Sequence, residues 1–226
     1  MSLILNIDTS LETAFINIAD KGVPLGSLYN MEQKEHAAFL QKGIKELCLQ
    51  LAVRLSSLSA IAVTSGPGSY TGLRVGMSGA KGICYSLKKP FITIGTLNMI
   101  AKSAANLMKV QQIQASWIVP MIDARRMEVF TSVFNEQMEE RIAPRALILD
   151  SFSFLEELEK QKISFCGNGA GKFQSMINHP NAFFLDPGDN NLALSQLSFQ
   201  KFSQSFFTDL ADSQPTYVKE YYTLPI

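Results

Sequence analysis

The order in which hydrophobic periods follow one another constrains the fold of this chain more than any other feature. In the N-terminal half, strand-like apolar runs cover residues 3–7, 14–19, 25–31, 60–64 and 91–94. Between the third and fourth runs, Leu40, Ile44, Leu47 and Leu51 recur at the spacing of one helix face. A second helix is predicted to end near Lys88, shortly before a proline. Three strands followed by helix, strand, helix and strand predict a mixed sheet whose last strands run parallel through helical crossovers.

The same order begins again at Trp117. The expected strands of this second cycle cover residues 117–122, 127–134, 145–149 and 163–166. A helix predicted over residues 151–160 precedes the last of them, and the loop 167–170 then follows that strand as a glycine-rich loop follows the strand at 60–64. A repeated order of elements indicates two similar α/β lobes.

We expect the boundary between the lobes after residue 98. Residues 1–98 form the predicted N-terminal lobe, which carries the partner interface discussed below. Residues 99–226 are expected to contain the rest of a linker helix, the C-terminal lobe and a C-terminal helix with its tail. Phe199, Phe202 and Phe206 mark one face of that late helix.

The balance of charges limits the ligands that this chain binds by itself. Twenty Lys and Arg residues oppose twenty Asp and Glu residues, so the formal net charge is zero. A chain with no net positive charge is not expected to bind nucleic acid through its own surface. Binding of an RNA would require a contribution from another subunit. Charged residues make up only 18% of the sequence, below the roughly 25% of an ordinary globular chain. The apolar surplus favours a protein interface.

The cysteines and the N-terminus indicate a reducing compartment. Cys48, Cys84 and Cys166 are odd in number and widely spaced, which supports neither a disulfide framework nor a zinc ribbon. The first eight residues lack the basic region of a signal peptide. No apolar run approaches the ~20 residues needed to span a bilayer. We therefore expect a cytoplasmic location and no membrane contact.

The most informative motif is the glycine-rich stretch over residues 65–76, SGPGSYTGLRVG, between a strand and a helix. Glycines at a helix N-terminus leave backbone N–H groups open to an anion. The stretch matches neither the Walker A loop nor the Rossmann fingerprint, because Gly72 comes one residue late for the latter. The alternative is a tight turn in which Ser69 or Thr71 caps the helix.

The helix that follows carries a stripe of small residues. Gly72, Gly76, Gly79, Ile83 and Ser86 fall on one face. Each glycine costs about 1 kcal/mol relative to alanine inside a helix, so the stripe should be offset by close approach of another backbone. That backbone belongs either to the protein's own sheet or to a second subunit.

Residues for metal or nucleophilic chemistry are sparse. His36 and His179 are the only histidines, so the HxxxH and HExxH zinc patterns are absent. His36 lies on the apolar face of its predicted helix, where a packing or interface histidine is the simpler interpretation. The sequence contains no GxSxG nucleophile elbow and no cysteine in an activating context.

Two polar turns end the first strand of each predicted lobe. Asp8-Thr9-Ser10 ends one, and Asp123-Ala124-Arg125-Arg126 ends the other. Short polar side chains at this position can hold a phosphate or a metal-bound water, although Asp and Thr also simply close hairpins. The two arginines suit a carboxylate or phosphate, although exposure alone would explain them.

These pieces together resemble a known family. The segments that carry the resemblance are residues 7–10, 65–76, 80–82, 123–126 and 128–130. They are similar to the bacterial TsaB family, also called YeaZ, a component of the tRNA threonylcarbamoyladenosine machinery. The resemblance is strong up to about residue 135, fair at 167–170 and weak between them. The closing residues 215–219 carry Lys219 where the family usually has Arg, a change that removes bidentate hydrogen bonding there.

The resemblance implies a fold and a role. It implies the α/β fold of the actin-like, hexokinase-like ATPases (ASKHA, ribonuclease H-like), with two similar lobes and mixed sheets. It also implies a pseudo-enzyme, with no cofactor, that binds the related catalytic subunit TsaD and acts with the ATPase TsaE. TsaD transfers the threonylcarbamoyl group to the adenosine beside the anticodon of tRNA. Because TsaB and TsaD share a fold, the same patch should form a homodimer when the partner is absent.

Carried over residue by residue, the resemblance assigns three sites. The TsaD interface would contain His36, Leu40, Ile44, Gly72, Gly76, Gly79 and Ile83. A vestigial nucleotide or anion site would contain Asp8, Thr9, Ser10, Gly66, Gly68, Ser69, Gly167 and Gly169. The contact with the third subunit would contain Asp123, Arg125 and Arg126. No residue is assigned to catalysis or to a metal.

Two other functions compete with this one. The first is an ATP-dependent phosphotransferase of the same fold, with Asp8, Thr9, Gly66 and Gly68 around a phosphate and Gly167 and Gly169 near an adenosine. Specific nucleotide binding with turnover would distinguish it. The second is a metallopeptidase, which needs a metal for which the sequence has no evident ligands.

Overall fold

The computed structural model of the chain describes residues 2–219 and divides into two compact units. Among these residues, the first lobe contains 2–99 together with Asp189–Thr216, and the second contains Ile100–Gly188 together with 217–219. The division predicted from the sequence, residues 1–98 and 99–226, is therefore wrong for the C-terminal helix and most of the tail, which return to the first lobe.

The first lobe is built on a five-stranded mixed sheet. Its strands are β1 (Leu3–Asp8), β2 (Ala14–Asp20), β3 (Val23–Asn30), β4 (Ala60–Gly66) and β5 (Phe91–Gly95), in the order β3-β2-β1-β4-β5. The hairpins β1–β2 and β2–β3 are antiparallel, whereas β1–β4 and β4–β5 are parallel. The parallel pairs are those joined through helices, as the element order predicts.

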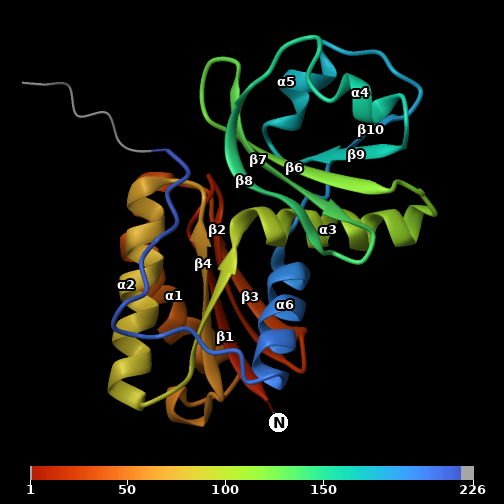
Figure 1. Ribbon diagram of the computed structural model, residues 1–226. Helices are drawn as coiled ribbons and strands as arrows, with labels where there is room; N and C mark the ends of the chain where they lie inside the picture. Colours follow the sequence, from red (N-terminus) through yellow and green to blue (C-terminus); the bar gives the residue numbers. More distant parts are fainter. Residues whose placement is uncertain (1, 220–226) are drawn as a thin grey trace, which may run out of the picture. The chain divides into compact units, whose positions relative to one another are not determined.

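Helices cover both faces of this sheet (Figure 1). They are α1 (His36–Gln50) and α2 (Tyr70–Leu87) on one face and α6 (Asn191–Ser203) on the other, with short 3-10 turns at Gln33–Glu35 and Leu55–Ser57. Alternate residues of β1 divide between the two cores: Leu5 and Ile7 pack with the α1 and α2 side, and Ile4 with the α6 side. A strand covered on both faces is buried along its whole length, as β1 is, although two of its six residues, Asn6 and Asp8, are polar.

A buried polar network fixes α6 on the sheet. The amide of Asn191 contacts Asn17 on β2 and Ser27 on β3, and Asn17 also accepts from Asn6 at 2.8 Å. Ala193 and Leu194 of α6 are buried in the apolar core beside it. Because these contacts join residues more than 160 positions apart, no local sequence signal announces the return of the helix to this lobe.

The second lobe repeats the sheet of the first. Its strands are β6 (Trp117–Asp123), β7 (Glu128–Asn135), β8 (Glu140–Ile148), β9 (Ile163–Cys166) and β10 (Ala182–Leu185), in the order β10-β9-β6-β7-β8. The hairpins β6–β7 and β7–β8 are antiparallel, and β6–β9 and β9–β10 are parallel. The two similar α/β lobes with mixed sheets that the sequence predicts are confirmed.

Two of the three helices of the second lobe, among the residues that the structure describes, are short. Helix α3 (Thr96–Gln111) passes from the first lobe into the second at Ile100, and the others are α4 (Leu155–Leu158) and α5 (Ala170–Gln174). The core that α4 and α5 cover is aromatic. Phe165 lies 5.4 Å from Phe154 and 4.9 Å from Phe173 between ring centroids, both edge-on, and stacks on Phe184 at 5.3 Å.

Several predicted boundaries differ from the structure. The helix expected over 151–160 is only Leu155–Leu158, because turns occupy 151–154 and Phe154 is left-handed with φ 60°. The strand expected at 145–149 begins earlier, at Glu140, and β10 was not predicted. Phe206 lies beyond the end of α6 and is 66% exposed, so the predicted aromatic face stops at Phe202.

Candidate functional site

The turn after β1 is closed by hydrogen bonds onto a buried carboxyl group. The Asp8 Oδ1 atom accepts from the Ser10 backbone N–H at 2.9 Å, the Ser10 hydroxyl at 2.6 Å and the Thr64 hydroxyl of β4 at 2.7 Å. The other oxygen, Oδ2, is buried without a hydrogen-bond partner among the described residues. Asp8, Thr9 and Ser10 are all buried. This turn is therefore part of the interior of the first lobe.

Burial changes the protonation of two groups near this turn. It raises the pKa of Asp8, and the hydrogen bonds from Ser10 and Thr64 oppose that rise. It lowers the pKa of His36, whose Nε2 lies 3.1 Å from the Glu12 carbonyl oxygen, while that carbonyl and the charge of Asp8 oppose the decrease. Both shifts favour the neutral form, as expected for groups removed from water.

The glycine-rich loop packs directly against this turn. A Cβ atom at Gly68 would overlap the Ser10 carbonyl oxygen, and one at Gly72 would overlap the Thr9 carbonyl oxygen. The Ser69 N–H donates to the Ser10 carbonyl at 2.7 Å, and the Ser69 hydroxyl accepts from the Gly72 N–H at 3.3 Å, capping α2. The Ser69 and Gly72 N–H groups, which an anion would need as donors, therefore already donate to acceptors within the protein. The alternative interpretation of the motif, a tight capped turn, describes these contacts.

The C-terminal tail covers the last glycine of β4. The Thr216 N–H donates to the Ser65 carbonyl at 2.7 Å, and the Thr216 carbonyl oxygen lies 2.5 Å from where a Cβ of Gly66 would be. Gly66 has φ +111°, which L side chains rarely adopt. Gly66 is therefore required for two reasons: its backbone conformation is unfavourable for other residues, and a side chain would collide with the tail.

The glycine stripe of α2 also faces the protein's own interior. A Cβ at Gly76 would overlap the Thr9 hydroxyl and lie 3.3 Å from Val63, and one at Gly79 would lie 2.7 Å from Leu40 of α1. The internal-packing alternative therefore accounts for Gly72, Gly76 and Gly79.

The same holds for most other residues assigned to the partner interface. His36, Leu40 and Ile44 are 2%, 3% and 5% exposed, and Ile83 is half-buried beside the core. The assignment at these buried positions is wrong as a contact surface, because the apolar face of a surface helix packs on its own sheet first.

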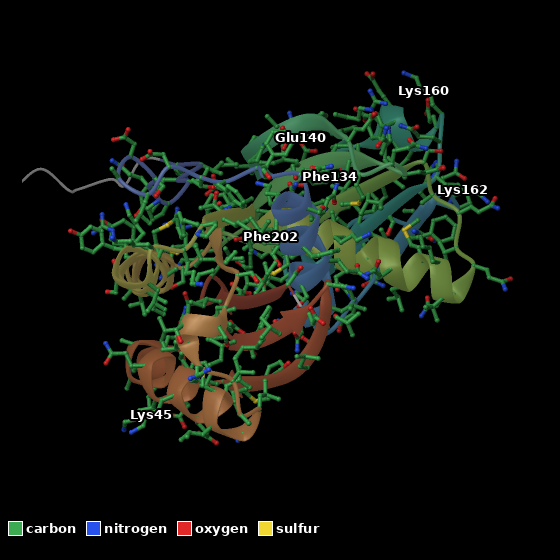
Figure 2. The ribbon with its side chains drawn as sticks, turned by 90° about the horizontal axis from the view of Figure 1, so that it is seen from below. Lys45, Phe134, Glu140, Lys160, Lys162 and Phe202 are labelled. Carbon is green, nitrogen blue, oxygen red and sulfur yellow. The ribbon has the colours of Figure 1, made fainter. Side chains whose placement is uncertain are left out.

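Helices α1 and α2 present a different set of residues to solvent. On α1, Figure 2 shows Lys45 pointing away from the lobe, and the exposed set is Ala37, Ala38, Gln41, Lys42, Lys45, Glu46, Leu49 and Gln50. On α2 the exposed set is Thr71, Arg74, Ser78, Gly82, Tyr85 and Ser86, with open space around Gly82 and Tyr85 80% exposed. We call these two sets the outer helix surface. This surface was not predicted; an aromatic residue on the polar side of α2, Tyr85, is the sequence signal that could have indicated it.

The corresponding turn of the second lobe is exposed and charged. The Lys172 ammonium lies 2.7 Å from Asp123 Oδ1, and the Arg125 N–H donates to the same oxygen at 2.6 Å. Burial alone would raise the pKa of Asp123, but the hydrogen bonds from Lys172 and the Arg125 backbone hold it below its usual value. Glu128 at the start of β7 pairs with Lys219 at 2.9 Å. No local sequence pattern predicted these two ion pairs, because the paired residues lie far apart in the chain.

The eight residues predicted for a nucleotide or anion site divide between the lobes. The first lobe brings together Asp8, Thr9, Ser10, Gly66, Gly68 and Ser69. Gly167 and Gly169 belong to the second lobe, where Gly167 packs against the Met121 carbonyl oxygen and Gly169 against the end of β6. Both halves are packed against the chain's own backbone.

The histidines do not share a site in either lobe. His36 belongs to the first lobe and His179 to the second, where its Nδ1 accepts from the Asn181 N–H at 3.2 Å. Between residues 2 and 219, no three His, Cys, Asp or Glu side chains gather in a way that could hold a metal ion. Over the same residues, no helix is both long and apolar enough to cross a bilayer.

Comparison with known proteins decides the family. A family profile described as "TsaD: tRNA N6-adenosine threonylcarbamoyltransferase" matches residues 30–222. The tRNA threonylcarbamoyladenosine biosynthesis protein TsaB of Bacillus subtilis is 26% identical over 203 residues, which cover 87% of this chain and 85% of that protein. YeaZ from Pseudomonas aeruginosa superposes with a TM-score of 0.75 at 27% identity, over 96% of this chain and 100% of that chain. The chain belongs to the TsaB (YeaZ) family.

This TsaB-family chain is therefore a tRNA threonylcarbamoyladenosine biosynthesis protein. It is also similar to the transferase itself. A tRNA N6-adenosine threonylcarbamoyltransferase of Borrelia garinii is 26% identical over 204 residues, which cover 84% of this chain but 53% of that protein. The chain thus spans about half of that relative.

Proposed function

We propose that this chain is a noncatalytic subunit that binds a TsaD-like catalytic subunit and, with a TsaE-like ATPase, supports threonylcarbamoyl transfer to the adenosine beside the anticodon of tRNA. The observation that carries the proposal is the closure of the glycine-rich loop by the chain's own backbone. Thr9 and Ser10 occupy the space beside Gly68 and Gly72, and Ser69 N–H donates internally. A loop filled in this way serves packing rather than phosphate transfer.

The proposed TsaD contact is the outer helix surface. Gly82 has open space around it, and Tyr85 is 80% exposed beside it. A small residue next to an exposed aromatic residue lets a partner helix approach closely and supplies an anchor for it. The same surface would pair with itself in the absence of TsaD, giving a homodimer.

The remaining partners follow from charge. With a formal net charge of zero, the chain would meet tRNA only as part of the complex. Asp123, Arg125 and Arg126 are proposed as the contact with the TsaE-like subunit. A role in tRNA modification would place the protein in the cytoplasm.

The test measures association with the TsaD of the same organism by size-exclusion chromatography with light scattering, together with ATP turnover by each protein. The wild-type chain should form a one-to-one heterodimer and show no turnover alone. Gly82→Arg should stay folded, because its Cβ meets nothing within 4 Å, and should lose the heterodimer. Gly171→Arg, whose Cβ also meets nothing within 4 Å but lies in the second lobe, is the matched control and should bind normally.

ATP turnover by the chain alone, without association, would overturn this function and favour the phosphotransferase alternative. A Gly82→Arg variant that still binds TsaD would move the contact away from the outer helix surface while leaving the scaffold function intact.

A further inference from the structure

In the part of the chain that the structure describes, the two sheets have four edge strands, β3 and β5 in the first lobe and β8 and β10 in the second. An edge strand offers unpaired backbone N–H and C=O groups, which proteins usually block with charges, proline, bulges, short strands or a covering segment. Strand β10 has only four residues. Strand β8 shifts register twice against β7 and carries Glu140, Arg141, Pro144 and Arg145. Both edges of the second sheet are therefore protected.

The chain covers the β5 edge with its own residues. The Thr208 N–H donates to the Phe91 carbonyl at 2.8 Å, and the Thr208 hydroxyl accepts from the Thr93 N–H at 3.1 Å. The Lys201 ammonium of α6 donates to the Thr93 carbonyl at 2.8 Å. Backbone groups of β5 that another strand would need are thus already bonded.

Strand β3 has the least protection of the four. It has eight residues, VPLGSLYN, none of them charged, and β2 is the one described strand that pairs with it. Pro24 and a register shift in the pairing with β2 obstruct only the beginning of the strand. From Gly26 to Asn30 the register with β2 is regular. We call residues 26–30 the free β3 edge.

Exposed apolar side chains flank the free β3 edge. Leu25, Tyr29 and Met31 are 47%, 45% and 81% exposed. Tyr29 is held in place, because its hydroxyl donates to Asp189 at 2.7 Å and accepts from Asn191 at 2.8 Å. A strand pairing here would cover these side chains with its own alternate residues.

The end of β3 at Asn30 is acidic. Asp189 reaches this end through its hydrogen bond with the tyrosine hydroxyl. Glu32, whose N–H donates to Asn30 Oδ1 at 3.1 Å, is exposed there. Glu35 adds a third carboxylate, and Lys34 is the opposing charge. The excess of negative charge favours a basic residue in a segment that binds beside it.

We propose that the free β3 edge binds an extended segment of another protein, which pairs antiparallel with β3, alternates apolar and polar side chains, and is basic at its N-terminal end. Antiparallel pairing is slightly more stable per residue than parallel pairing. It also places the N-terminal end of the segment beside the acidic end of β3. Backbone hydrogen bonds supply the affinity, and the exposed apolar side chains select the alternate residues. This site shares no residue with the outer helix surface.

The test uses the full chain and two synthetic peptides of identical composition. Each peptide alternates valine and threonine over the length of β3 and carries a pair of lysines, at its N-terminal end in one and at its C-terminal end in the other. The peptide with N-terminal lysines should slow amide hydrogen exchange in β3. By calorimetry it should bind about tenfold more tightly than the other peptide, because only its lysines meet the acidic end of the strand. Equal affinity of the two peptides would overturn the proposed orientation.

A third peptide separates strand pairing from apolar adhesion. It has proline in place of every threonine, so it keeps the apolar residues and the lysines but loses alternate N–H donors and the extended conformation of a paired strand. It should neither bind nor slow exchange in β3. Binding equal to that of the threonine peptide would overturn the proposal.

Variants of the chain locate the contact. Leu25→Lys/Met31→Lys places charges beside the free β3 edge, the kind of protection that β8 has, and should weaken binding of the first peptide by at least about tenfold. The matched control, Leu49→Lys/Val110→Lys, changes two side chains that are also exposed and adds the same charge. It should bind like the wild type, and both variants should keep the thermal stability of the wild type. Equal weakening by both would reduce the effect to net charge and overturn the site.

Two further results would contradict the proposal. One is unchanged exchange in β3 at every concentration of the peptide with N-terminal lysines. The other is slower exchange in β3 when the wild-type chain alone is concentrated, which would make a second copy of the chain the occupant. Neither measurement requires TsaD, so their outcome is independent of the function proposed above.

Discussion

The two lobes have sheets of the same topology, and the first strand of each ends in an aspartate, yet the two turns differ in environment. Asp8 of the first lobe is fully buried and accepts three hydrogen bonds from hydroxyl and backbone groups. Asp123 of the second lobe is exposed and pairs with Lys172. Burial raises the pKa of the first, whereas hydrogen bonds overcome the effect of burial and lower the pKa of the second.

The helices that follow explain the difference. In the first lobe, the 18-residue helix α2 begins beside the turn. Gly72 of α2 and Gly68 in the loop before it lie against the Thr9 and Ser10 carbonyl oxygens, respectively. In the second lobe, α5 has five residues and packs over an aromatic core. One sheet topology therefore supports either a sealed interior turn or an open charged hairpin, depending on the length and composition of the next helix. The sealed turn belongs to the interior of the first lobe, whereas the open hairpin leaves its charged side chains exposed.

The largest effect should come from the aromatic core that compensates for the short helices of the second lobe. Phe165→Ala removes a ring that contacts three other rings and should destabilise that lobe by about 3–5 kcal/mol. Amide hydrogen exchange read separately for each lobe measures it, with exchange accelerated in β6, β7 and β9 and unchanged in β1 and β2. Equal acceleration in both lobes would show that they unfold as one unit.

The second-largest change in stability is expected at Gly72 in the first lobe, compared with Gly171, which follows the equivalent loop of the second lobe. Gly72→Ala places a Cβ against the Thr9 carbonyl oxygen and should cost about 3 kcal/mol, because neither backbone can move freely. Gly171→Ala in α5 meets nothing within 4 Å and should gain up to about 1 kcal/mol. Denaturant unfolding of each variant gives the comparison. A Gly72→Ala protein as stable as the wild type would contradict the sealed turn.

The two aspartates should respond to pH with opposite signs. The folded pKa of Asp8 is raised above 3.8, so its contribution is largest below that value and decreases as the pH rises toward the folded pKa. Asp8→Asn should therefore gain stability relative to the wild type between pH 4 and 7. The folded pKa of Asp123 is lowered, so Asp123→Asn should lose stability relative to the wild type as the pH rises through 3.8. Parallel curves for the two variants would remove the distinction between the turns.

The smallest effect should come from the exposed ion pair. Lys172→Ala removes the partner of Asp123 and should cost about 0.5 kcal/mol at neutral pH, the typical value of a surface pair. The loss should disappear as the pH falls through the lowered folded pKa of Asp123, because the protonated carboxyl group no longer pairs with the ammonium. Thermal unfolding over a series of pH values from 7 downward measures both. A loss that stays constant over the whole acid range would assign the role of Lys172 to its hydrogen bond with the Glu128 carbonyl.

Local patterns were sufficient for most elements of the fold. The period of Leu40, Ile44 and Leu47 predicted α1, and alternating or continuous apolar runs predicted nine of the ten strands that the structure describes. The missed strand, β10, has only four residues between polar segments. The prediction of a helix over 151–160 was wrong, because Phe154 adopts a left-handed backbone conformation. The apolar residues around it gave no signal of that conformation.

The sequence was less informative about the candidate site. The glycine motif was located correctly, but its periodicity could not tell which groups approach Gly72 and Gly76. In the structure both glycines lie against Thr9, more than 60 positions away: Gly72 against its carbonyl oxygen and Gly76 against its hydroxyl. The residues first assigned to a partner, such as Leu40 and Ile44, are the apolar ones, and an apolar stripe marks the face turned inward. The outer face, with Gly82 and Tyr85, followed only from burial.

The sequence by itself determined the family, the repeat of two mixed sheets and the position of each polar turn, because hydrophobic period and turn chemistry are local properties of the chain. The tertiary structure alone decided that α6 returns to the first lobe through Asn17 and Asn191. It also decided that Asp8 is sealed while the arginines of the second hairpin stay exposed. Those outcomes depend on contacts between residues far apart in the chain, which no local pattern encodes.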